Sequence, residues 1–217
     1  MIKPTSTFTL LSILLFSLPS KAFSDWQSFT LDNDLFVKND NGYTNGLYYS
    51  RYTLDGPRYP ERNTQEPNFL LKPLTWSVNK IAGATHLKSL TIGQSMNTPS
   101  DITLNPPNPN DIPYSGFLYL SSSFLTITPN YADKIATTVG IIGPSSGAEV
   151  VQSLIHETVG SQEPQGWDHQ LKDEIVFQLS RARAWRSWAS DKNDFDLVGG
   201  AEVNLGTIES SLAAGLM

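Results

Sequence analysis

Three polar residues in one short segment have the types and the spacing that acid–base chemistry needs. Glu149, Gln152 and His156 stand at positions i, i+3 and i+7, and in an α-helix such residues lie within about 60° of one another on one face. A histidine beside a carboxylate and an amide can be oriented as a general base. The same spacing also fits a solvated polar side that carries one histidine, and the spacing alone favours that second interpretation.

The segment around these residues carries the signals of a short helix. Ser145 or Ser146 can cap its first turn, and Glu149 stands at the capping-box distance from Ser146. Gly160 is placed to end the helix after about Val159. The side opposite the three polar residues is apolar and consists of Val150, Val151, Leu154, Ile155 and Val159.

The first polar stretch along the chain, "LDNDLFVKNDNGYTNGLYYS" at 31–50, is rich in oxygen donors. Hard donors of this kind suit calcium, but the EF-hand pattern fails, because aligning its invariant glycine with Gly42 puts Val37 at the first ligand position. Asn and Asp also form turns without a metal, and "NDNG" is an ordinary hairpin signal. Taken alone, the stretch is predicted to be a turn. Its candidate ligands are Asp32, Asn33, Asp34, Asp40 and Asn41.

Eight stretches alternate between apolar and polar residues with the period of a β-strand. Many run about ten residues, which is long for a soluble sheet and right for a tilted strand that crosses a membrane. We predict an all-β fold, an antiparallel outer-membrane β-barrel with one short helix in a long connection, although a soluble sandwich would also alternate. The stretches lie near Trp26–Leu31, Leu47–Leu54, Leu87–Gln94, Phe117–Thr128, Ala132–Ile142, Glu174–Ser187, Phe195–Leu205 and Ile208–Met217.

The connections and the aromatic residues also favour a membrane barrel. The connections Tyr59–Lys80, Asn97–Pro113 and Gly143–Lys172 are long, and such uneven loops suit a barrel with long turns on one side and short turns on the other. Aromatic residues gather near strand ends, as in the aromatic girdles of such barrels. These residues are Trp26, Tyr114, Tyr119, Tyr131, Trp185 and Trp188.

The N-terminus and the composition predict an exported protein. Lys3, the apolar run Phe8–Leu18 and small residues up to Ala22 form a signal peptide over residues 1–22, and residues 23–217 form the barrel domain. The net charge of −6 argues against a nucleic-acid partner. The absence of cysteine excludes a disulfide framework, and no later stretch is apolar enough for a transmembrane helix.

Several motifs, in this order along the chain, resemble the signature blocks of the outer-membrane lipid A 3′-O-deacylases, the LpxR-type family. The resemblance covers nearly all of residues 27 to 215, and the Gly-Pro, Gln, His and Gly-Trp-Asp blocks together make it specific. The motifs are "NDLF", "YTNGLYYS" (43–50), "TIGQSMNTPSDI" (91–102), "DIPYSGFLY" (111–119), "GIIGPSSGAEVVQSLIHETVG" (140–160) and "PQGWDHQLKDE" (164–174).

The resemblance implies a twelve-stranded outer-membrane barrel that uses calcium to hydrolyse an ester-linked acyl chain of lipid A in lipopolysaccharide. It implies a monomer whose active site lies inside the barrel near its outer-leaflet end, where the first polar stretch meets the helix in the lumen. The family's functional residues match the catalytic candidates His156, Asn33 and Gln152, the substrate or oxyanion candidates Thr44 and Trp167, and the metal candidates Asp34 and Gln162.

Two departures from the family pattern leave a second function open. Where the family has a Lys-Arg pair, this chain has about Leu104 and Asn105, and Gln162 replaces an acidic residue. The alternative to a hydrolase is therefore a non-catalytic outer-membrane barrel, a pore or structural protein that keeps the fold. Because eight strands end part-way through "SSLAAGLM", and an open sheet edge in lipid is untenable, we also expect the barrel to be C-terminally incomplete.

Overall fold

The computed structural model describes residues 25–33, 42–56, 66–78, 81, 83–191 and 194–217, with only the backbone at residues 33 and 42–44. The predicted signal peptide and Asp34 therefore lie outside the described residues. None of the helices in these ranges has both the length and the hydropathy needed to cross a bilayer.

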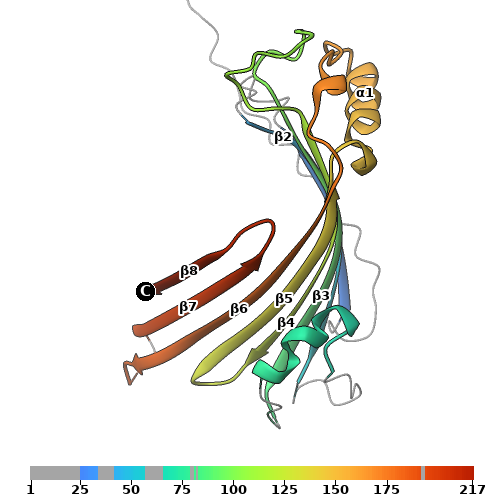
Figure 1. Cartoon of the computed structure of the whole chain (residues 1–217). Coiled ribbons are helices and arrows are strands. Elements are labelled where there is room, and N and C mark those ends of the chain that lie inside the picture. The colour runs from blue at the N-terminus through green and yellow to red at the C-terminus, as the bar shows by residue number, and fades with distance from the viewer. Residues whose placement is uncertain (1–24, 34–41, 57–65, 79–80, 82, 192–193) are drawn as a thin grey trace, which may run out of the picture.

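The strands form one antiparallel sheet in which each strand pairs with its neighbours in the sequence (Figure 1). All eight predicted strands are confirmed, and most extend beyond the predicted bounds. β1 and β8 are the two edges of the described sheet. The strands are β1 (Asp25–Asn33), β2 (Gly42–Asp55), β3 (Thr85–Thr98), β4 (Ser115–Ile127), β5 (Tyr131–Ile142), β6 (Glu174–Ala189), β7 (Asp196–Gly206) and β8 (Ser211–Leu216).

Two adjacent rows of residues show that the faces of the sheet differ in chemistry. Residues directly opposite one another in antiparallel strands share a face, and successive residues alternate between faces. The row Phe29, Tyr49, Ile92, Leu120, Val139 and Phe177 defines what we call the apolar face. The next row, Ser28, Ser50, Thr91, Ser121, Thr138 and Gln178, defines the polar face.

Hydrogen bonds link the polar face across strands, whereas large side chains of the apolar face are exposed. The Ser50 and Thr91 hydroxyls are 2.7 Å apart, and the hydroxyl of Thr138 donates to that of Ser121 at 2.8 Å. Phe29 and Ile92, by contrast, are 57% and 52% exposed. At the level of these two rows, one exposed apolar row and one hydrogen-bonded polar row are the arrangement of a membrane-barrel wall, with the apolar row toward lipid.

The sequence had predicted that the long connections would lie at one end of the sheet. In the structure they lie at both ends. The connections 99–114 and 143–173 meet at one end, where Gln165 N–H donates to Ile102 O at 2.8 Å and Leu171 N–H to Tyr114 O at 3.0 Å. The connection between β2 and β3 lies at the other end and contains the helix η2 (Phe69–Ser77), which is teal in Figure 1.

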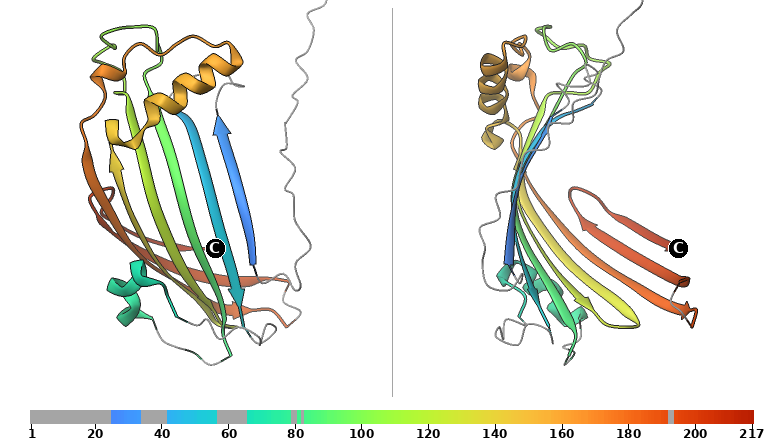
Figure 2. Two further views of the ribbon diagram at one scale, coloured as in Figure 1. Left: turned by 90° about the vertical axis from the view of Figure 1, so that its right-hand side faces the viewer. Right: turned by 180° about the vertical axis from the view of Figure 1, so that it is seen from behind.

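One α-helix, α1 (Ala148–Val159), lies between β5 and β6. Its end at Gly160 agrees with the prediction. Figure 2 shows that the sheet curves, and that α1 lies on the side away from β7 and β8. In the left-hand view α1 passes in front of the ends of β4, β3 and β2 toward β1. Two short 3-10 turns flank it, η3 (Pro144–Ser146) and η4 (Trp167–His169).

Candidate functional site

A glycine in β4 lets the start of α1 approach the sheet closely. A Cβ at Gly116 would overlap the side chains of Ser146 and Ala148. Gly116 is the direct partner of Met96, and the amide of Gln94 donates to Ser146 O at 2.7 Å. Met96 and Gln94 alternate with Ile92 along β3, so they belong to the apolar face. α1 therefore packs on the apolar face of the sheet.

The predicted serine cap of α1 is wrong, because both serines bond elsewhere. Gly147 is the N-cap, with a left-handed backbone at φ 70°, and the hydroxyl of Ser146 donates to Gly143 O at 2.6 Å. Ser145 donates from its N–H and its hydroxyl to the Asp173 carboxylate, at 2.8 and 2.6 Å. These two hydrogen bonds stabilise the charged form and lower the pKa of Asp173. The same hydrogen bonds connect the turn before α1 to the residue that precedes β6.

The helix buries polar residues against the sheet and leaves apolar ones exposed. Gln152 and His156 are 1% and 5% exposed, whereas Val150 and Leu154 are 72% and 62% exposed. The alternative of a solvated polar side is therefore wrong for these two polar residues. Glu149 is exposed, so it does not share their environment, although the helical wheel placed all three on one face.

The tautomer of His156 follows from its hydrogen bond. Its Nδ1 contacts the backbone carbonyl oxygen of Gln162. A carbonyl oxygen can only accept, so Nδ1 carries the proton, and in the neutral ring Nε2 is then the unprotonated nitrogen. A backbone carbonyl, and not the predicted Glu149 carboxylate, orients this imidazole. The Nε2 atom has the electronic state that a general base requires.

Gln152 is held by an indole in the same buried layer. Trp167 is 2% exposed, and its Nε1–H donates to Gln152 Oε1 at 2.8 Å. An indole can only donate, so this bond fixes the amide orientation. It leaves the Nε2 of Gln152 as a buried donor with no partner.

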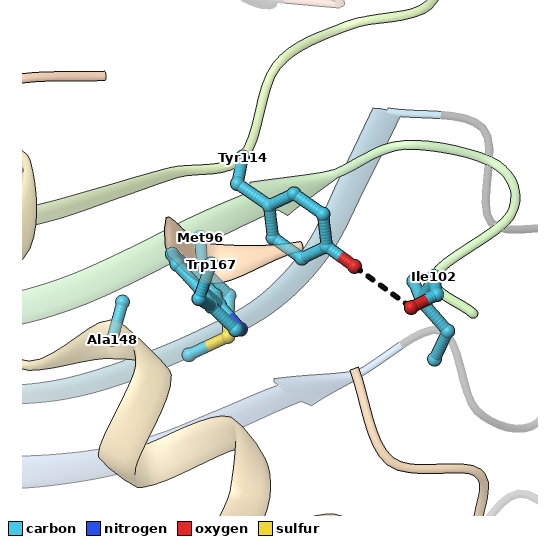
Figure 3. Close-up of a cluster of buried hydrophobic side chains, with 5 residues drawn as sticks. All are labelled: Met96, Ile102, Tyr114, Ala148 and Trp167. Atoms are coloured by element: carbon cyan, nitrogen blue, oxygen red, sulfur yellow. Dashed lines mark hydrogen bonds between the residues drawn. The ribbon is translucent and has the colours of Figure 1, made fainter. Parts of the chain in front are cut away.

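Trp167 belongs to a small cluster of buried hydrophobic side chains (Figure 3). The Tyr114 ring lies 4.9 Å from the Trp167 ring between centroids, and its hydroxyl donates to Ile102 O at 3.1 Å. Met96 and Ala148 complete the cluster. Tyr114, which the sequence placed in an aromatic girdle, is fully buried here. The cluster holds Trp167, and through it Gln152, in a defined position.

The sheet adds two polar residues that the sequence analysis missed. Asn45 is 2% exposed and pairs directly with Met96, and its Oδ1 has no hydrogen-bond partner. The Oε1 of Gln94 is also buried without a partner. Buried polar atoms are nearly always satisfied, so these two oxygens near the start of α1 are candidates for contact with a ligand or with water. The signal for Asn45 was its place within "YTNG", next to the candidate Thr44.

The backbone register brings the candidates of the first polar stretch to the same place. Asn33, at the end of β1, is the direct partner of Asn45. The ladder between β2 and β3 shifts between Tyr43 and Asn45, so the backbone of Thr44 is the extra residue of a β-bulge. Asp34 follows Asn33 directly but lies outside the described residues.

The site lies on the face of the sheet that carries the apolar row. Asn45, Gln94 and the contacts of α1 all belong to that face. Leu154 and Val150 on the outer side of α1 are exposed, which fits a helix beside lipid. The described strands form a sheet with two edges, so the expected position inside a closed barrel stays a prediction.

A metal site is only partly visible in the structure. No three His, Asp or Glu side chains gather as ligands among the described residues. Gln162 is exposed, and its backbone oxygen is engaged by His156. The unpartnered oxygens of Asn45 and Gln94 are hard donors of the kind that calcium takes. Asn105, at the place of the family's cationic pair, instead bonds to His169 Nε2 at 3.0 Å through its Oδ1.

A family model described as "Outer membrane protein LpxR" matches residues 8–217. The chain belongs to the LpxR family. A solved structure, "LpxR from Salmonella typhimurium", matches with a TM-score of 0.58 and 18% sequence identity, over 82% of this chain and 52% of that one. The chain thus has the fold of LpxR and spans about half of the length of the Salmonella protein. None of the curated proteins matches the chain.

Proposed function

We propose that the protein is a calcium-dependent hydrolase of the outer membrane. Its substrate would be lipid A of lipopolysaccharide, from which it removes an ester-linked acyl or acyloxyacyl chain at the 3′ position. The observation that carries the proposal is His156, a buried imidazole on α1 whose Nδ1 is engaged by the Gln162 carbonyl, which leaves Nε2 for proton transfer. The family resemblance supplies the reaction, and the site supplies residues whose chemistry suits it.

The position of the site favours an amphiphilic substrate. The lipid-facing row of the sheet and the exposed Leu154 of α1 lie on the same side of the wall as the buried polar atoms of Gln152 and Asn45. A lipid that reaches the apolar face laterally would place its acyl chains on that face and its ester groups at the polar end. An ester of a membrane lipid lies at this boundary, so it can meet the imidazole without leaving the membrane.

In the proposed reaction His156 acts as general base and then as general acid. Nε2 takes a proton from a water molecule while the water oxygen bonds to the ester carbonyl carbon. The tetrahedral intermediate then breaks its bond to the sugar oxygen, and the imidazolium returns the proton to that oxygen. The products are a fatty acid and a free sugar hydroxyl. The Gln162 carbonyl stabilises the imidazolium that forms between the two steps.

The other candidates take roles around this base. The Nε2 atom of Gln152, which has no partner, is a donor for the developing oxyanion. We assign Asn33 to catalysis beside His156, and Thr44 to contact with the substrate, from their places at the β1–β2 pairing. Trp167 was a candidate for substrate or oxyanion contact, but its N–H is engaged by Gln152. We therefore propose that Trp167 positions Gln152.

Calcium remains a proposal that the donor set supports in part. Asp34 would be the charged ligand, with Gln162 as the further candidate from the family pattern. The oxygens of Asn45 and Gln94 are additional donors beside the pairing position of Asn33. When bound, the ion would polarise the ester carbonyl and offset negative charge on its oxygen.

Mass spectrometry of lipid A from cells that express the protein tests the function. Lipid A should lose the mass of one ester-linked chain, and His156→Ala should abolish the change, since loss of a general base costs about 10²–10⁴ in rate. His169→Ala is the matched control, because His169 is exposed and the described polar contact of its side chain is with the loop residue Asn105. This control should behave as the parent.

The result that contradicts the proposal is specific. Unchanged lipid A, with the protein recovered in the outer membrane, would support the non-catalytic barrel. Equal activity of His156→Ala and the parent would remove His156 from the mechanism.

A further inference from the structure

The second helical element of the structure, η2, has no role in the proposed reaction. It packs on the apolar face of the sheet, as α1 does, but toward the opposite end. Leu71 is 1% exposed and packs with Phe124 and Ile135. The Asn68 amide donates to the Ser122 hydroxyl at 2.6 Å. Ser122 and Phe124 alternate with Leu120 of the lipid-facing row, so η2 covers the same face of the wall.

The outer side of η2 is apolar and uncovered. Trp76 is 84% exposed and Phe69 is 69% exposed. The indole N–H of Trp76 donates to the backbone oxygen of Pro73 at 2.9 Å, so one polar atom of the ring is satisfied while the ring itself stays exposed among the described residues. A solvated periplasmic or external helix has no reason to present two large aromatic rings outward. Aromatic residues of this kind are enriched where a membrane meets water.

The distance between the two covered ends of the wall matches a bilayer. α1 packs at the level of Met96 and η2 at the level of Lys88, whose strand partner is Phe124. At about 3.3 Å per residue the strand between them is about 26 Å long, or about 20 Å along the membrane normal for a tilt of about 40°. An apolar band is about 25 Å tall, so the two elements lie near its two borders.

The charges behind η2 complement lipid phosphates. Arg181 and Arg183 both bond to Asp133, which is 2% exposed, and Arg181 also donates to the Ser77 backbone at the end of η2, at 3.2 Å. The two guanidinium groups exceed the single carboxylate that they share. Lys72 on η2 itself is exposed. Arginine beside the headgroup layer is well suited to phosphate.

We propose that η2 is an interfacial anchor that lies in the headgroup layer of the leaflet opposite to the one at α1, with Trp76 and Phe69 inserted at the boundary with the acyl chains. The occupant of its outer surface is phospholipid. The anchor is continuous with the lipid-facing surface of the sheet. It depends on the sheet being a membrane wall and does not depend on the hydrolase activity.

Depth-dependent fluorescence quenching of the full chain in phospholipid nanodiscs tests the anchor. Phospholipids with bromine near the glycerol end of the acyl chain quench shallow tryptophans, and bromine near the methyl end quenches deep ones. The share of emission lost to shallow bromine should fall in Trp76→Phe relative to the parent, with a smaller change for deep bromine. Acrylamide in the water should quench the parent and Trp76→Phe to a similar fraction.

A matched control comes from the polar face. Trp26 stacks on Tyr52 with centroids 5.0 Å apart, and this pair alternates with the lipid-facing row. Trp26→Phe should leave quenching by either brominated lipid unchanged. The anchor is overturned if Trp76→Phe loses no lipid quenching, or loses acrylamide quenching instead, which would place Trp76 in water. Stronger quenching of Trp76 by deep bromine would also overturn it, because the ring would lie in the hydrocarbon core.

Discussion

The indole N–H of Trp167 donates a 2.8 Å hydrogen bond to Gln152 Oε1, and both residues are almost fully buried. Trp167→Phe removes the donor and leaves the amide oxygen unsatisfied, which costs about 1–3 kcal/mol. We expect a lower thermal midpoint in detergent together with reduced lipid A hydrolysis. The double variant Trp167→Phe, Gln152→Leu should regain stability, since replacing both partners by apolar groups is nearly neutral, but not activity. A stability as low as that of Trp167→Phe alone would show that this bond is not what the indole supplies.

The contact of Gly116 with α1 predicts that a single methyl group displaces the helix. A Cβ at this position would overlap Ser146 and Ala148. Gly116→Ala should therefore lower activity by about 10²-fold, the effect expected of roughly 1 Å of misplacement, while membrane insertion is kept. Gly215→Ala, where a Cβ would meet nothing within 4 Å, is the control. Activity assays beside outer-membrane fractionation measure both, and full activity of Gly116→Ala would contradict the packing of α1 on β4.

The exposed apolar side of α1 predicts a role at the lipid surface. Leu154 is 62% exposed, so Leu154→Asp would be harmless if the helix faced water. If it faces lipid, this change should lower hydrolysis of membrane-embedded lipid A and leave hydrolysis of a soluble short-chain ester unchanged. Leu154→Met keeps the apolar surface and should match the parent. Equal loss on both substrates would mean that Leu154→Asp damages the fold and not the encounter with lipid.

The unpartnered oxygen of Asn45 predicts a ligand contact. Asn45→Leu removes that oxygen from the buried site and should lower activity at least tenfold and weaken calcium binding. Asn45→Asp keeps an oxygen donor and adds charge, so it should retain activity. Isothermal titration with calcium and lipid A mass spectrometry check the pair. If Asn45→Leu is as active as Asn45→Asp, the Oδ1 atom of Asn45 contacts neither calcium nor the substrate.

The acidic residues of the first polar stretch predict different effects of two aspartates. Asp34 directly follows Asn33, the strand partner of Asn45, and it is the proposed charged ligand for calcium. Asp34→Ala should abolish calcium-dependent activity, with poor rescue by added calcium, whereas Asp40→Ala should be nearly silent because that residue belongs to the predicted turn. Activity after chelation of divalent cations is the measurement. Activity that survives chelation, or a stronger effect at Asp40, would contradict the calcium proposal.

Local patterns in the sequence were enough to predict the strands and the faces of the sheet. The alternation in Leu47–Leu54 and Glu174–Ser187 has the period of a strand because side chains point to opposite faces in turn, and both segments are strands in the structure. The helix around His156 and its end at Gly160 followed from the helical period and from a residue that adopts a left-handed backbone. Such signals depend on neighbours in the sequence.

The side of the wall that α1 covers was decided by contacts between residues far apart in the chain. Gly116 leaves room for Ala148, and the Gln94 amide bonds to Ser146, so the helix lies on the face of the sheet that carries the apolar row. The orientation of His156 by the Gln162 carbonyl, and the burial of Asn45, arise from the same packing. A helical wheel gives the angles between side chains about one axis, but only tertiary packing determines which of them meets the wall.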